Sequence, residues 1–157
     1  MSKQLWLLRH GDAEPHGTRP DPERALTERG EQQSRDAGRA FAALGLEFAS
    51  VWTSPKVRAR DTAILACRAF GGGAPIEHAA LFAGFSGADA LDVLASVGVE
   101  EKVLVVGHEP DFSQVVFDLT GARIDLKKGG VAAVRVDGSR GELLVLLRPR
   151  ELSAMAG

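Results

Sequence analysis

The run Val103-Leu104-Val105-Val106 is the feature that most constrains how this chain can fold. An uninterrupted apolar run of this kind is typical of a strand that is buried on both faces, and such strands occur in parallel sheets covered by helices on each side. We therefore predict that a strand from Lys102 to Gly107 lies in the centre of a sheet. A similar run, Leu5 to Leu8, lies in a predicted strand from Lys3 to Arg9.

Strand and helix signals alternate along the rest of the chain. Two further strands are predicted at 48–53 and 75–78, and two last strands, 131–136 and 143–147, are joined as a hairpin through Asp137 to Gly141. Apolar residues at helical spacing predict four helices: between Thr27 and Gly45, from Ser54-Pro55 to Gly71, over 88–95, and from Pro110 to Gly121. The order predicts a three-layer α/β/α fold with a mostly parallel central sheet and an antiparallel edge hairpin.

Length, charge and cysteine content limit the classes of protein to which this chain can belong. The chain has 157 residues, which fits a single domain spanning 1–157. Its net charge of -2 gives no overall basic field, so we do not expect nucleic-acid binding. A single cysteine, Cys67, the absence of a signal segment and the absence of an apolar stretch of about 20 residues predict a cytoplasmic protein without membrane attachment. No long apolar surface stripe stands out, and we expect a monomer.

Polar side chains follow the two most apolar strands. Arg9 and His10 stand at the end of the first strand, and His108 follows the Val-rich strand. Open α/β sheets bind ligands at the carboxyl ends of their strands, so the two histidines are predicted to meet there. Gly11 allows the backbone to turn sharply and to approach a ligand closely. The arginine makes an anion the expected ligand.

Three cations begin the helix that follows Ser54-Pro55: Lys56, Arg58 and Arg60. A cation in the first turn opposes the helix dipole and costs roughly 0.3 to 1 kcal/mol, so a sequence selected only for stability would avoid it. A bound anion would reverse that cost. Arg58 is adjacent to the predicted buried stripe and is expected to point into the site, whereas Lys56 and Arg60 are expected to be solvated.

Four ordered motifs resemble those of the histidine phosphatase superfamily. They are Leu8-Arg9-His10-Gly11-Asp12-Ala13, Leu26-Thr27-Glu28-Arg29-Gly30, Ser54-Pro55 with Arg58-Ala59 and Thr62-Ala63, and Gly107-His108-Glu109-Pro110. The resemblance covers about residues 3 to 148 and is strongest to the compact SixA-type phosphohistidine phosphatases. It implies a phosphoglycerate-mutase-like fold, a nucleophile at His10, phosphate-binding groups at Arg9, Arg58 and Gly11, and a second catalytic histidine at His108.

The chemistry of these residues agrees with that resemblance. An imidazole with a pKa near ~6.5 is largely neutral at physiological pH and can attack phosphorus, which would make a covalent phospho-His10 intermediate. Phosphoryl transfer depends mainly on positioning and electrostatic stabilisation. Arg9, Arg58 and a cationic His108 could supply that stabilisation, so we expect neither a metal nor another cofactor.

A general acid is harder to place. Larger members of the superfamily carry a carboxylate after the third strand, but the stretch from His78 to Ser86 contains no Asp or Glu. A leaving imidazole, with a pKa of only about 6.5, needs an acid less than an alcohol does. The short stretch also provides no lid domain. We therefore predict hydrolysis of phosphohistidine on a protein. Glu109 and Asp12 remain the candidates for a general acid.

Three alternatives remain open at this level. A small-molecule phosphomonoesterase would use the same residues, and a non-catalytic phosphate- or phosphoprotein-binding module would use the same arginines. A metal hydrolase would need His10 and His108 with Asp12 or Glu109 as ligands, but the adjacent arginines would repel a dication and no clustered ligand motif is present. Of the other residues, Cys67 is predicted in the core, and His16 and His78 are predicted to be loop or surface residues.

Overall fold

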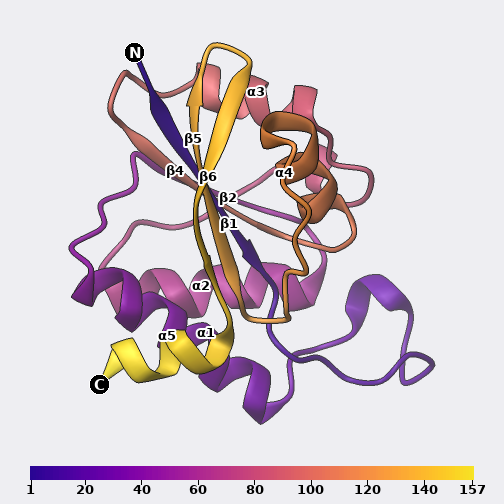
Figure 1. Ribbon diagram of the computed structural model, residues 1–157. Coiled ribbons are helices and arrows are strands. Elements are labelled where there is room, and N and C mark those ends of the chain that lie inside the picture. The colour runs from indigo at the N-terminus through magenta and orange to yellow at the C-terminus, as the bar shows by residue number, and fades with distance from the viewer.

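The structure, a computed structural model, describes residues 1–157. Six strands form one sheet in the order β3-β2-β4-β1-β5-β6 (Figure 1). Their bounds are Lys3–Arg9 for β1, Ser50–Thr53 for β2, Ile76–Glu77 for β3, Lys102–Gly107 for β4, Val131–Asp137 for β5 and Arg140–Leu147 for β6. The strands β1 to β4 run parallel, and β5 and β6 pair antiparallel at one edge. The predicted fold class is confirmed, with β4 inside the sheet.

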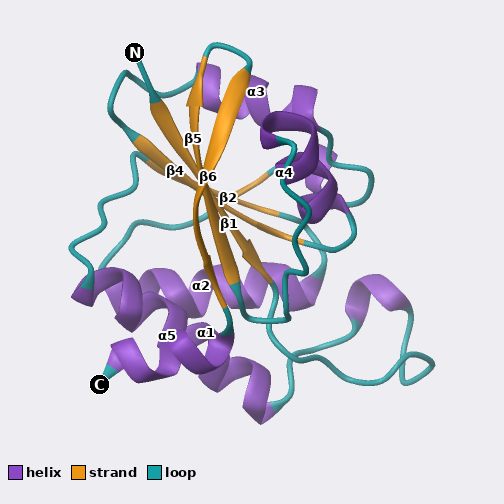
Figure 2. Ribbon diagram, viewed as in Figure 1, coloured by secondary structure: helices purple, strands orange, loops and turns teal.

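Five helices cover the two faces of the sheet (Figure 2). They are α1 (Glu28–Ala43), α2 (Val57–Phe70), α3 (Gly87–Ala95), α4 (Asp111–Thr120) and α5 (Pro149–Ala156), with short 3-10 turns at Asp21–Glu23 and Ala79–Leu81. The helices α1, α2 and α5 lie on one face, and α3 and α4 lie on the other. None of them is both long enough and apolar enough to cross a membrane.

The core has two halves because side chains alternate across β1. Leu5 and Leu7 pack with the residues of α3 and α4, while Trp6 and Leu8 pack with those of α1, α2 and α5. Leu5, Leu7 and Leu8 are fully buried. Full burial of one such side chain contributes roughly 1.5 to 3 kcal/mol to folding, which is why the strand that leads to Arg9 is fixed in place.

Two boundaries and one element differ from the sequence-based predictions. The prediction that α2 starts at Ser54-Pro55 is wrong, because the Ser54 amide continues the sheet by donating to the Val106 carbonyl, and the helix begins at Val57. The hairpin strands extend further than predicted, which leaves a two-residue turn. Helix α5 was not predicted. It is anchored by fully buried Leu152, its only buried residue.

Candidate active site

The ends of β1 and β4 bring the two histidines together. The strands pair in parallel with Arg9 opposite Gly107, so His10 and His108 leave neighbouring strands at the same edge of the sheet. Their ring centroids lie 5.3 Å apart with an interplanar angle of 54°. The exposed fractions of the two residues are only 6% and 7%. The sequence-based expectation that these histidines face each other agrees with this geometry.

The backbone around His10 is held from both neighbouring strands. The His10 amide donates to the Gly107 carbonyl at 3.0 Å, and the Arg9 amide donates to the Gly130 carbonyl at 3.0 Å. The Gly129 amide donates in turn to the His10 carbonyl at 2.9 Å. Because these bonds fix the main chain on two sides, the imidazole is positioned by the sheet rather than by a free loop.

The hydrogen bond made by His10 sets its tautomer. Its Nδ1 lies 2.7 Å from the main-chain oxygen of Gly11. A carbonyl oxygen can only accept, so Nδ1 carries the proton and Nε2 keeps a free lone pair. Burial lowers the pKa of His10 to about 3; the bond to Gly11 opposes that shift, and the positive charges of Arg58, Arg9 and Lys128 add to it. The imidazole is therefore neutral at physiological pH.

Ser54 orients the second histidine. It follows β2, and its Oγ lies 2.8 Å from Nε2 of His108. Burial, followed by the neighbouring His10 and the cations Arg58 and Lys56, lowers the pKa of His108 to about 3. These surroundings favour the neutral ring, and a cationic His108 beside a phosphoryl group stays a prediction. Its Nδ1 is buried and has no hydrogen-bond partner.

Two arginines flank the histidines. Arg58 lies in the first turn of α2 and is 6% exposed, and its Nη1 donates to the main-chain oxygen of Asp21 at 2.8 Å. Arg9 donates from Nη1 to the main-chain oxygen of Leu126 at 2.9 Å. The Nε atoms of both arginines are buried without a partner, like Nδ1 of His108. An unsatisfied buried donor costs about 1 to 3 kcal/mol, so oxyanion oxygens that accept from these groups would be bound favourably.

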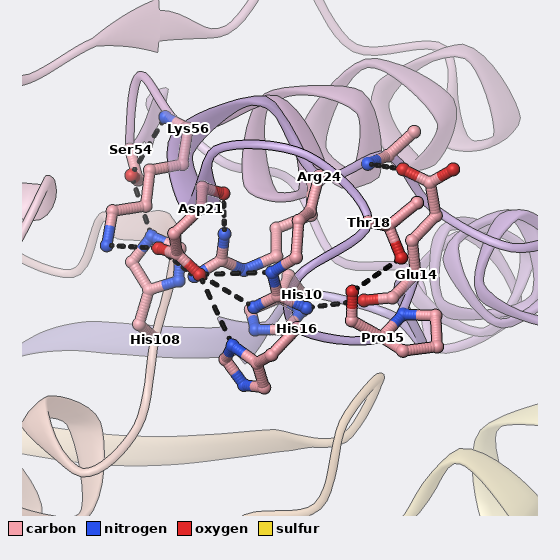
Figure 3. Close-up of polar contacts among 12 residues, drawn as sticks. His10, Glu14, Pro15, His16, Thr18, Asp21, Arg24, Ser54, Lys56 and His108 are labelled. Atoms are coloured by element: carbon pink, nitrogen blue, oxygen red, sulfur yellow. Dashed lines mark hydrogen bonds and ion pairs between the residues drawn. The ribbon is translucent and has the colours of Figure 1, made fainter.

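A carboxylate that the sequence analysis missed lies among these cations. Asp21 stands between Lys56 and Arg24 (Figure 3). Its Oδ1 lies 2.9 Å from Nη2 of Arg24, and its Oδ2 lies 3.4 Å from Nζ of Lys56 and 3.3 Å from Nη2 of Arg58. Partial burial raises the pKa of Asp21, but the Arg24 hydrogen bond and the charges of Arg58 and Lys56 more than offset it and hold this pKa well below its usual range.

Two predictions about the surrounding cations have different outcomes. The prediction that Lys56 is solvated is wrong, because its side chain is only 13% exposed and pairs with Asp21. Arg60 is solvent-exposed beside Asp61, as expected. Arg24 was not singled out from the sequence, and its side chain is only 9% exposed. No local pattern marks Arg24, since it lies in a polar loop and is buried only through contacts with Asp21 and the Glu14 main-chain oxygen.

The glycine after His10 has a packing role that the sequence did not reveal. A Cβ on Gly11 would lie 2.5 Å from the main-chain oxygen of Gly30 in α1. The Gly11 amide donates to Oγ1 of Thr62, at 3.1 Å. The contact that requires a glycine here is thus with the start of α1, and a phosphate contact at Gly11 stays a prediction.

The two carboxylates considered as general acids both have hydrogen-bond partners. Asp12 accepts from the hydroxyl of Thr27 at 2.8 Å and lies 3.8 Å from Nζ of Lys128. Glu109 accepts from the amide of Ser113 at 2.7 Å and from the Ser113 hydroxyl, at the start of α4. Their part in proton transfer stays a prediction.

Three remaining predictions concern residues outside this centre. Cys67 is buried in the core as predicted, and burial raises its thiol pKa to about 11. His16 is exposed. His78 lies in the loop after β3, as predicted, and is half-buried because its ring packs between Trp52 and Phe85. No three His, Cys, Asp or Glu side chains are grouped so that they could hold a metal ion.

Comparison with known proteins places this chain. A model of the histidine phosphatase superfamily (branch 1) matches residues 5–84. An uncharacterised protein of Picosynechococcus sp. is 30% identical over 167 residues, covering 95% of this chain and 98% of the relative. The solved structure of the protein histidine phosphatase SixA complexed with tungstate matches with a TM-score of 0.84 at 23% identity, over 95% of this chain and 99% of SixA. A mutant phosphoserine phosphatase of Entamoeba histolytica in complex with phosphoserine matches with a TM-score of 0.73 at 14% identity, over 96% of this chain and 99% of that protein. The fold is phosphoglycerate-mutase-like, and the chain belongs to the histidine phosphatase superfamily.

Proposed function

We propose that this protein is a phosphatase that hydrolyses phosphohistidine on another protein through a covalent phosphoryl intermediate on His10. The observation that carries the proposal is the state of the His10 ring. Its Nδ1 keeps the proton and donates a hydrogen bond to the Gly11 carbonyl oxygen, 2.7 Å away. This leaves Nε2 unprotonated in a buried, cation-rich site. A neutral imidazole with a free nitrogen is the form that attacks phosphorus.

The reaction has two steps. In the first, the Nε2 lone pair of His10 bonds to phosphorus, and the bond between phosphorus and the substrate imidazole breaks. The electron pair of that bond stays on the substrate nitrogen, which takes up a proton. In the second, water attacks phospho-His10, gives a proton to the solvent and releases inorganic phosphate, which returns the electron pair to Nε2. Arg9 and Arg58 stabilise the charge on the phosphoryl oxygens in both steps.

His108 has a role that depends on the bound anion. Its pKa is low while its neighbours are His10, Arg58 and Lys56. A phosphoryl group beside its unpartnered Nδ1 adds negative charge, which favours the protonated form and raises the pKa. We propose that His108 becomes a donor to a phosphoryl oxygen when substrate binds.

The identity of the leaving group follows from the carboxylates near the site. Asp21 is ionised, because its pKa is held well below the usual range, and an ionised carboxylate cannot donate a proton. The connection from β3 to α3 carries only a short 3-10 turn and no carboxylate between His78 and Ser86. A phosphoramidate, whose imidazole leaving group has a pKa of about 6.5, tolerates the lack of a strong acid there. Asp12 and Glu109 remain the proposed acids where one is needed.

A small phosphorylated molecule is the second substrate class. The phosphoserine phosphatase of Entamoeba histolytica shares this fold and was solved with a small phosphomonoester bound. An alcohol leaving group would make a general acid necessary, so this function requires Asp12 or Glu109 to deliver a proton.

A substrate panel tests the proposal. Wild-type protein and His10→Ala are compared on a phosphohistidine peptide, a phosphoserine peptide and free phosphoserine, each with and without a chelator. We expect the phosphohistidine peptide to be hydrolysed fastest, no effect of the chelator, and no turnover by His10→Ala. An acid-labile phosphoenzyme that depends on His10 should be trapped by rapid quenching. Faster hydrolysis of free phosphoserine would favour the second class. Binding of phosphate with neither turnover nor a phosphoenzyme would indicate a non-catalytic binding module.

A further inference from the structure

A groove of about 670 Å³ lies beside the proposed catalytic centre. Six basic side chains line it, and we call it the basic groove: Arg9, Arg29, Lys127, Lys128, Arg148 and Arg150. Only two acidic side chains, Asp12 and Asp36, line it as well. The basic groove is therefore positively charged, although the whole chain carries a net charge of -2.

Helices α1 and α5, which lie side by side in Figure 1, supply part of this charge. Arg29 lies in the first turn of α1, and Arg150 lies in the first turn of α5. A cation at either place opposes the helix dipole, so neither arginine stabilises its own helix there. Arg29 forms no ion pair within 4.0 Å in this structure. Its charge is therefore free to meet an anion from outside.

The cations that form ion pairs have exposed or half-exposed partners. Arg148 lies 2.8 Å from Glu151, and Arg150 lies 3.7 Å from the same carboxylate. Lys127 and Lys128 each lie beside an exposed or half-exposed aspartate. Exposed ion pairs contribute little to stability, so these cations can exchange their partners for the carboxylates of another molecule at small cost.

The basic groove is continuous with the catalytic centre. Arg9 lines it and also flanks His10. Lys128 lines it and is one of the charges that act on the His10 ring. The Gly129 amide, next to Lys128, donates to the main-chain oxygens of Arg9 and His10. If a substrate has its phosphoryl group at Arg9, an acidic group of the same substrate close to that phosphoryl group would therefore lie in the groove.

The lining of the groove indicates what binds there. None of its lining side chains is hydrophobic. Pockets for small organic ligands are mostly apolar with a few polar groups, so this surface fits an extended series of carboxylates better than a compact organic molecule. We propose that the basic groove binds acidic side chains flanking the phosphohistidine of the partner protein and so selects acidic phosphoproteins. This inference rests on the proposed function.

Two phosphohistidine peptides test it, one with four flanking glutamates and one with glutamines in their place. They are compared on wild-type protein, on the groove variant Arg29→Glu/Arg150→Glu and on the control variant Arg68→Glu/Arg140→Glu. The control arginines lie outside the groove and, like Arg29, form no ion pair within 4.0 Å, and both variants change the net charge equally. We expect wild-type protein to prefer the acidic peptide by about tenfold in KM, with equal kcat.

The groove variant should lose that preference while its kinetics on the glutamine peptide stay unchanged, and the control variant should keep it. Equal use of both peptides by wild-type protein, or equal losses in both variants, would overturn the inference. A second readout, fluorescence anisotropy of the unphosphorylated acidic peptide, does not require turnover. If no peptide is hydrolysed, the proposed function fails, and weaker peptide binding by the groove variant alone would still support the groove. Displacement of the peptide by an equal concentration of citrate would indicate that the groove binds a small polyanion. That result would overturn the inference that it binds a partner protein.

Discussion

Asp21 places a carboxylate against Arg58, the guanidinium that we propose to hold the phosphoryl group. The same carboxylate contacts Arg24 and Lys56. Because Asp21 is ionised at every physiological pH, a phosphoryl dianion that enters the site meets a competing negative charge. Asp21 thus partly neutralises Arg24, Lys56 and Arg58, and an anion that binds Arg58 must share or displace that contact.

Asp21→Asn tests this competition. Removing the negative charge leaves three cations to face an entering anion, so we expect the dissociation constant for orthovanadate to fall by about three- to tenfold. Isothermal titration calorimetry would measure it, with Asp61→Asn, at an exposed aspartate of α2 paired with Arg60, as the matched control. Weaker vanadate binding by Asp21→Asn would mean that Asp21 mainly holds Arg24 and Arg58 in place.

Arg58 and Arg60 form a natural pair of test sites because they lie two residues apart on α2, one buried and one exposed. Loss of one donor to a transition-state oxyanion costs about 100- to 1000-fold in rate, and we expect Arg58→Ala to lower kcat/KM by that amount. Arg60→Ala should leave kcat/KM unchanged. Equal kinetics of Arg58→Ala and wild-type protein on the phosphohistidine peptide would remove Arg58 from the mechanism.

At the scale of elements, the start of α1 packs against the loop after β1 without room for a side chain. A Cβ on Gly30 would lie 1.9 Å from the main-chain oxygen of Asp12. Alanine gains about 1 kcal/mol over glycine in helix propensity, but an overlap this short must push the loop and helix apart. The contact therefore ties α1 to the segment that follows His10.

Gly30→Ala should accordingly lower the free energy of unfolding by about 2 to 4 kcal/mol, despite the gain in propensity. Urea denaturation monitored by circular dichroism would measure it. Gly73→Ala is the control, because no atom lies within 4 Å of a Cβ at that position and its φ is not positive. Unfolding free energies that agree between Gly30→Ala and wild-type protein would show that the loop moves freely.

The elements that the sequence predicts well are those whose signal is local. Apolar runs identified β1 and β4. The helix predicted after Thr27 is α1, where the Thr27 side chain accepts from the Gly30 amide, and glycines marked several helix ends. The parallel arrangement then placed Arg9, His10 and His108 at one sheet edge, because strand ends meet there by topology. Most of the site is predictable for this reason.

The features that the sequence did not reveal depend on distant contacts. Asp21 and Lys56 are 35 positions apart in the numbering and meet only when the loop after β1 folds against α2. Helix α5 buries a single leucine and packs on α1, so its position depends on a surface formed by a distant part of the chain. The neutral form of His108 depends on its burial and on cations from other elements. None of these properties has a local sequence signal.

At the scale of the whole molecule, the two buried histidines make stability depend on pH. Their pKa values in the folded protein are lowered to about 3, from the ordinary value of 6.5. Between these values the unfolded chain binds protons that the folded chain does not. The part of the free energy of unfolding that depends on these histidines has its full value above pH 6.5. It falls as the pH is lowered toward 3, by up to about 1.4 kcal/mol per pH unit for each histidine.

Urea denaturation between about pH 7 and 5 would measure this slope in a window above the ordinary pKa of carboxylates. We expect wild-type stability to fall on acidification and His10→Asn to show a shallower slope, because one buried histidine has been removed. A wild-type stability that does not change over this range would mean that both rings take up protons freely in the folded state.

The hydrogen bonds that hold Arg9 and His10 have a consequence for the order in which the protein is made. These two residues leave the ribosome well before their main-chain partners, which are Gly107, Gly129 and Gly130. Until residue 130 has been synthesised and released, the backbone of Arg9 and His10 lacks some of these hydrogen bonds, and β1 lacks its neighbour β5. Nascent chains that end before residue 130 contain the residues of the site but not its geometry, so the arrangement around His10 forms only after that residue has left the ribosome.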